Sequence, residues 1–109
     1  MPTPAIRDRY LRDPLPVRLG GIAADLARVA FCADNPKNHH AVASLLEESQ
    51  WFAEWAAPEA PLDVQEALAE FQVQAALWQR SWVAGRPEPS MRTGAQQWSD
   101  RLLKLSGLV

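Results

Sequence analysis

Two adjacent histidines and two adjacent glutamates, His39–His40 and Glu47–Glu48, are the side chains in this sequence most suited to chemistry. Imidazole and carboxylate groups can bind metal ions or transfer protons. On a helix, however, His40 and Glu47 lie two turns apart, about 10 Å, which is too far for one ion. His39 points to the far side, and the sequence has no HEXXH, EXXH or CXXC motif. We predict no metal and no cofactor, and keep as an alternative a small helical-bundle enzyme or metal-binding protein using His40, Glu47 and Glu48.

Cys32 is the single cysteine of the chain. It could act as a nucleophile beside a histidine, but a cysteine on an apolar helix is usually a small buried side chain. One cysteine cannot form an internal disulfide, which is typical of reducing compartments. No apolar run approaches the ~20 residues of a membrane span, and the first 14 residues show no signal-peptide pattern. We expect a cytoplasmic protein without a membrane partner and predict no catalytic residue.

Charge is distributed unevenly along the chain. Residues 38 to 79 contain seven acidic and no basic side chains, and the basic residues lie on either side. An arginine-rich segment near the amino terminus could contact nucleic acid through Arg7, Arg9, Arg12 and Arg18 together with Tyr10. The isoelectric point of about 5.6 and the acidic middle oppose this function, because phosphate contacts dominate such affinity. We keep nucleic-acid binding through the arm as an alternative.

Proline and glycine divide the 109 residues into segments with helical periodicity. We predict an all-α fold, an antiparallel four-helix bundle preceded by an irregular Pro-rich arm at residues 1–16. The four-helix domain covers residues 17–109, with helices at about 17–33, 38–56, 63–84 and 90–106. The connections are short, so consecutive helices should be antiparallel neighbours. No repeating strand pattern is present, and we expect no sheet.

Gly20 and Gly21 lie within the first of these helices, at a cost of roughly 1 kcal/mol each relative to alanine. Several alanines follow them, which suggests a smooth face that another backbone can approach closely. The alternative is that the helix begins later or bends at the two glycines.

Tryptophan is abundant, with five residues in the chain. The stripes of the predicted helices bury Trp78, Trp82 and Trp98, whereas Trp51 and Trp55 lie to one side of the stripe of their helix. Exposed indole rings of this kind usually mark a contact surface. We predict an interface with a second copy of the chain, formed by Trp51, Trp55, Glu48, Ser44, Tyr10 and Leu11. The alternative is that the amino-terminal arm covers these rings within one molecule.

Three segments, NPKNHHAVASLLEESQWFAEW, ALWQRSWVAG and QQWSDRLLKLSGL, resemble those of small all-helical proteins of unassigned function in cyanobacteria. The resemblance extends loosely over residues 12–109. It implies a cytosolic setting and no particular activity. From the residues themselves we predict a non-enzymatic protein–protein interaction module that works as a homodimer and docks onto an unidentified protein partner.

Overall fold

The computed structural model describes residues 3–109, and every regular element in that range is a helix. Four long helices follow one short helix, so the prediction of an all-α fold is confirmed. The ends of the long helices lie within two residues of the predicted bounds. In chain order the elements are α1 (Pro4–Arg12), α2 (Leu15–Cys32), the 3-10 turn η1 (Pro36–Asn38), α3 (His39–Ala56), the 3-10 turn η2 (Ala57–Glu59), α4 (Leu62–Val83) and α5 (Met91–Ser106).

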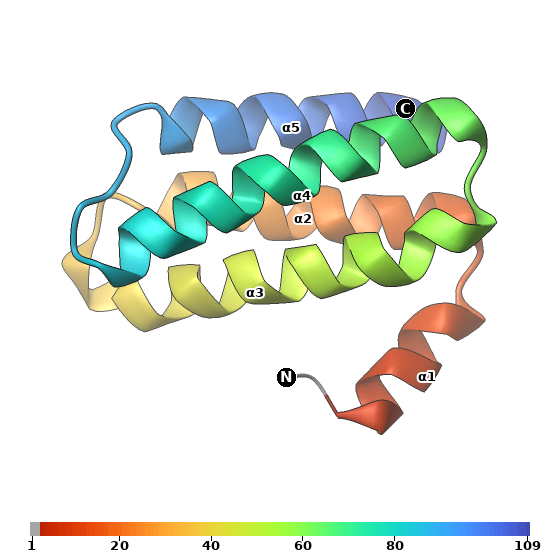
Figure 1. Cartoon of the computed structure of the whole chain (residues 1–109), viewed down its shortest axis with the longest axis horizontal. Coiled ribbons are helices and arrows are strands. Elements are labelled where there is room, and N and C mark those ends of the chain that lie inside the picture. Colours follow the sequence, from red (N-terminus) through yellow and green to blue (C-terminus); the bar gives the residue numbers. More distant parts are fainter. Residues whose placement is uncertain (1–2) are drawn as a thin grey trace.

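The long helices lie side by side, and the chain reverses direction from each one to the next (Figure 1). Helix α2 packs against both α3 and α5, and α3 also packs against α4. The longest dimension of the molecule is 35 Å, close to the ~33 Å length of the 22-residue helix α4. The long helices therefore run along the long axis, and α4 presents its outer side to the surroundings.

The predicted irregular arm was wrong for residues 4–12, which form α1. Its prolines were read as helix breakers, but proline is compatible with the first turn of a helix, where its missing N–H has no partner in any case. Pro4 is the first residue of α1, and Thr3 caps that helix by accepting a hydrogen bond from the Ile6 N–H. Pro16 likewise lies in the first turn of α2, which starts two residues earlier than predicted.

The core extends along the whole length of the long helices. Phe71 and three leucines of α2, α4 and α5 (Leu26, Leu68 and Leu102) are fully buried near its middle. Trp78 and Trp82 are buried at the end of α4, as their positions on the stripe predicted, and Trp98 is half-buried. Burial of such large apolar side chains is the main source of stability for a domain of this size.

The two glycines of α2 lie well inside the helix, so the alternative that the helix begins after them is wrong. A methyl group at Gly20 would lie 2.9 Å from Cδ1 of Leu108, which shows how closely the carboxyl-terminal segment approaches α2. The neighbouring contact with α5 is equally close, because the Ser99 hydroxyl donates a hydrogen bond of 2.7 Å to the Ala23 carbonyl. Small residues thus allow α5 to approach the backbone of α2.

Candidate functional site

Helix α1 covers part of the aromatic flank of α3. Tyr10 stacks on Phe52 with ring centroids 4.1 Å apart and an interplanar angle of 5°, and Trp55 lies 6.0 Å from the same ring. Trp51 contacts Trp55 at 5.9 Å, and both indoles are half-buried. Tyr10 is only 6 % exposed, so it cannot contribute to an interface while α1 remains in place. The intramolecular alternative therefore describes the contacts of Tyr10, Phe52 and Trp55.

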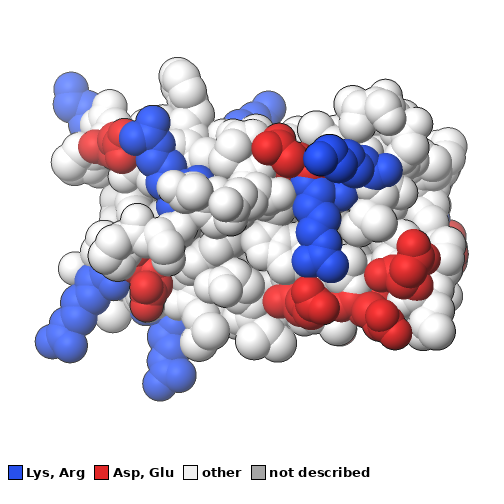
Figure 2. Space-filling model, turned by 90° about the horizontal axis from the view of Figure 1, so that it is seen from above, with Lys and Arg blue, Asp and Glu red and all other residues white. Residues whose placement is uncertain are grey.

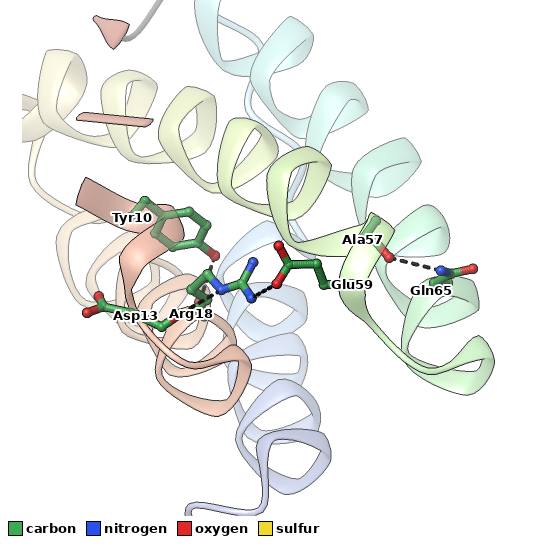
Figure 3. A network of polar contacts seen from close by, with 6 residues as sticks. All are labelled: Tyr10, Asp13, Arg18, Ala57, Glu59 and Gln65. Atoms are coloured by element: carbon green, nitrogen blue, oxygen red, sulfur yellow. Dashed lines mark hydrogen bonds and ion pairs between the residues drawn. The ribbon is translucent and has the colours of Figure 1, made fainter. Parts of the chain in front are cut away.

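A polar network fastens α1 to the rest of the molecule (Figure 3). The Tyr10 hydroxyl donates a hydrogen bond of 2.9 Å to the carbonyl of Arg18, and burial raises the pKa of that hydroxyl above its usual value. Arg18 Nε donates to the carbonyl of Asp13 at 3.0 Å, and its guanidinium pairs with Glu59 in the η2 turn. The network ties the turn between α1 and α2 to the η2 turn.

Arg18 therefore differs from the other arginines of the proposed nucleic-acid arm. Its side chain is buried and ion-paired, so it cannot reach a phosphate group. Arg7, Arg9 and Arg12 are exposed on α1, where Asp8 and Asp13 are also exposed. The structure thus leaves three of the four arginines accessible, among nearby acidic side chains.

Glu48 is directed toward a buried acid on the neighbouring helix. Its carboxyl group lies beside that of Asp25 on α2, which is 4 % exposed and whose Oδ2 has no hydrogen-bond partner within residues 3–109. Burial is the main cause that raises the pKa of Asp25 to about 8; the charge of Glu48 and a hydrogen bond to it add to this effect, and Arg28 opposes it. Asp25 therefore retains its proton at neutral pH. Sequence reasoning missed Asp25, although it is the single acidic residue of segment 17–33.

The remaining residues of the predicted interface are dispersed. Ser44 is exposed on α3, and Leu11 is half-buried on α1. The predicted surface therefore divides into Trp55, which α1 covers through Tyr10, Trp51, which contacts Trp55, an acidic side chain that faces α2, and an open position at Ser44.

The histidines and glutamates of the enzyme or metal alternative do not converge. Within residues 3–109, no three His, Cys, Asp or Glu side chains lie close enough together to hold one metal ion. His40 is exposed, whereas the ring of His39 stacks on Trp82 with centroids 5.1 Å apart. The Trp82 indole N–H also donates a hydrogen bond of 2.8 Å to the His39 carbonyl. This contact closes the end of the core between α3 and α4.

Several large apolar side chains remain exposed on the outer side of α4, although the most exposed one on a long helix is Phe31 of α2, at 87 %. Leu62 is 71 % exposed, Val73 is 65 % exposed and Leu77 is 50 % exposed. Three alanines on the same side are also exposed, namely Ala69, Ala76 and Ala84. We call Leu62, Ala69, Val73, Ala76, Leu77 and Ala84 the outer face of α4. Sequence reasoning considered only the core stripe of this helix and missed the second apolar stripe opposite it.

A polar groove separates this face from Trp51. It has a volume of about 350 Å³ and lies between α3 and α4, lined by Glu47, Gln50, Trp51, Glu54, Gln72 and Gln79. Gln50 spans the groove with a hydrogen bond to Gln79. Trp51 and the outer face of α4 therefore lie on the two sides of one groove, so a partner docked on α4 could also reach Trp51.

A second groove, of about 430 Å³, lies between α4 and α5. Trp78 forms part of its wall because Gly94 has no side chain; a methyl group there would lie 2.5 Å from Cζ2 of the indole. Arg101 covers the ring of Trp98 at 4.5 Å and pairs with Glu70 at 3.1 Å. The basic group of this groove is thus already occupied by internal contacts.

Comparison of the chain with protein-family models, with curated proteins and with solved structures found no match. Within residues 3–109, none of the helices combines the length and the apolarity that crossing a bilayer requires.

Proposed function

We propose that the protein is a non-enzymatic interaction module whose docking surface is the outer face of α4. In this proposal residues 15–106 act as an antiparallel four-helix bundle that holds α4 rigidly, and α1 is an added cover on α3. The observation that carries the proposal is the exposure of Leu62, Val73 and Leu77 along one side of a helix whose opposite side is already buried in the core.

The energetics favour a partner for this face. A fully buried Val or Leu gains about 1.5–3 kcal/mol relative to a fully exposed one. Because the three large side chains are 71 %, 65 % and 50 % exposed, covering them would contribute roughly 3–6 kcal/mol. An amphipathic surface helix normally carries polar residues on its outer side. Contiguous apolar surface on a folded helix is characteristic of protein contact sites.

Replacing two residues of the outer face tests the proposal. The V73Q/L77Q variant keeps residues that form helices well, so it should fold with a stability close to that of the parent protein. It should lose association, measured as self-association of the purified protein and as retention of proteins from a native extract. Phe31 supplies the control, because it is exposed on α2 beside α5 and remote from the outer face. The F31Q variant should associate like the parent protein.

Two outcomes would contradict the proposal. One is a parent protein that stays monomeric and retains nothing that the V73Q/L77Q variant fails to retain. The other is equal loss of association in V73Q/L77Q and F31Q, which would indicate non-specific adhesion of apolar side chains.

A further inference from the structure

We propose that the partner of the outer face is a second copy of this chain, with the two α4 helices packed antiparallel about a twofold axis at Val73. This inference rests on the proposed function and names its partner. It depends on the order of side chains along the outer side of α4, which reads Leu62, Glu66, Ala69, Val73, Leu77, Arg80 and Ala84. These residues recur at spacings of three and four, so they share one side of the helix.

The side chains along the outer side of α4 are complementary to those of a second α4 that runs in the opposite direction. In a twofold antiparallel pair, residues equally distant from the axis face each other across the interface. Glu66 and Arg80 lie seven positions before and after Val73, so the acid of one copy meets the base of the other. Seven residues correspond to about 10.5 Å along a helix, which places both ion pairs within the length of α4.

Side-chain size follows the same symmetry. Ala69 and Leu77 lie four positions on either side of Val73, and Leu62 and Ala84 lie eleven positions on either side. Each leucine would therefore face an alanine of the other copy, so that large and small side chains alternate across the contact. A parallel pair of α4 helices lacks this property, because it aligns Glu66 with Glu66 and Arg80 with Arg80. Like charges in such positions are destabilising.

The charges needed for this pairing are available. Glu66 and Arg80 are exposed, and neither makes an ion pair or a side-chain hydrogen bond within residues 3–109. Glu70, by contrast, is already paired with Arg101. Helix α4 runs from right to left in Figure 1. In Figure 2 acidic side chains gather at the lower right, whereas basic side chains project at the lower left beside an acidic one.

The size of the contact sets its expected strength. The outer face is about 33 Å long and a helix is about 10 Å wide, which gives about 330 Å² per copy and about 660 Å² for the pair, the size of a weak, transient contact. Association weaker than about 1 µM is therefore expected. Helix α1 lies beyond α3 and away from α4, so it leaves the contact unobstructed (Figure 1).

The test is sedimentation equilibrium of the full chain over roughly 1–300 µM, a range that brackets such an affinity. The parent protein should form dimers. The E66R and R80E variants should each dimerise about tenfold more weakly, because each replaces two attractive contacts with two repulsive ones. An equimolar mixture of E66R and R80E should regain the parent affinity, since every contact between the two variants is again between opposite charges. The E66R/R80E double variant should dimerise like the parent protein. Thermal unfolding of each variant verifies that the fold is retained.

Each contrary result has a distinct meaning. A parent protein that is monomeric throughout, yet retains a different protein through Val73 and Leu77, overturns the self-pairing and leaves the proposed docking function intact. A dimer that responds to V73Q/L77Q but whose two single charge variants do not recover on mixing overturns the antiparallel arrangement. A dimer insensitive to every α4 variant overturns both proposals.

Discussion

Two apolar regions on the sides of the long helices differ in whether another segment covers them. The aromatic flank of α3 is covered by α1, which inserts Tyr10 against Phe52 and Trp55. The outer face of α4 has no covering segment within residues 3–109, and Val73 stays 65 % exposed. The two regions differ in the polar contacts that hold a covering helix in place, rather than in the amount of apolar surface. Arg18 and Glu59 tie the covering helix in place with polar contacts, whereas the Gln50–Gln79 hydrogen bond beside the outer face of α4 joins α3 to α4 and holds no covering segment from residues 3–109.

Breaking the cover should have the largest effect. The Y10A variant loses a buried ring and its hydrogen bond, and we expect it to lower the free energy of unfolding by about 3 kcal/mol. Amide exchange in α1 should accelerate strongly, because its main contact with α3 is gone. Substituting the open face, as in V73A, should change stability by less than about 0.5 kcal/mol. Equal effects of Y10A and V73A in chemical denaturation would show that α1 is not held by Tyr10.

The buried acid pair between α2 and α3 predicts a pH dependence of intermediate size. Asp25 has a pKa of about 8 in the folded protein, above the ordinary value of about 3.9 that it has when unfolded. Between these values the folded chain binds more protons than the unfolded chain, so this group makes stability fall as pH rises from about 4 to 8.

The D25N variant removes this titration. Relative to the parent protein, its stability should increase by up to about 1.4 kcal/mol per pH unit between about pH 5 and pH 8, because the variant no longer has to bury a negative charge beside Glu48. Denaturant unfolding at several pH values measures this gain. Parallel pH profiles for D25N and the parent protein would contradict the raised pKa of Asp25.

Weakening the ion pair between Arg18 and Glu59, without removing Tyr10, should have the smallest effect on the packing of α1. The E59Q variant keeps a hydrogen-bond acceptor for Arg18 but removes the charge that offsets the buried guanidinium. We expect a loss of about 1 kcal/mol, together with faster amide exchange in α1. Glu88 offers a matched control in the exposed loop before α5, and the E88Q variant should leave both quantities unchanged. If E59Q behaves like E88Q, the Arg18 contacts do not hold α1.

The positions of the long helices were predictable because each has one clear apolar stripe and is bounded by proline or glycine. The same treatment of proline failed at Pro4 and Pro16, since a breaker within a helix is harmless in its first turn. The sequence also identified Trp51 and Trp55 as lying beside the core stripe. It could not reveal that Tyr10 packs against Trp55, because Tyr10 belongs to a different helix.

The other two omissions have separate physical causes. Glu48 was assigned to a surface because a helical wheel shows only one helix, whereas Asp25 approaches it from α2. The outer face of α4 was readable from the sequence, since Leu62, Val73 and Leu77 are spaced by eleven and four residues. The core stripe of α4, which contains Phe71 and Trp78, has larger apolar side chains than the outer stripe, and only the core stripe was used in the prediction.

The stack of Tyr10 on Phe52 joins residues forty-two positions apart in the chain. During synthesis, α1 leaves the ribosome well before the surface of α3 against which it packs. The side chains of Tyr10, Ile6 and Leu11 therefore stay exposed to water until α3 has emerged and packed against α2. The packing of α1 on the aromatic flank is accordingly a late step of folding. Nascent chains that end before α3 should be the most prone to aggregate or to bind chaperones.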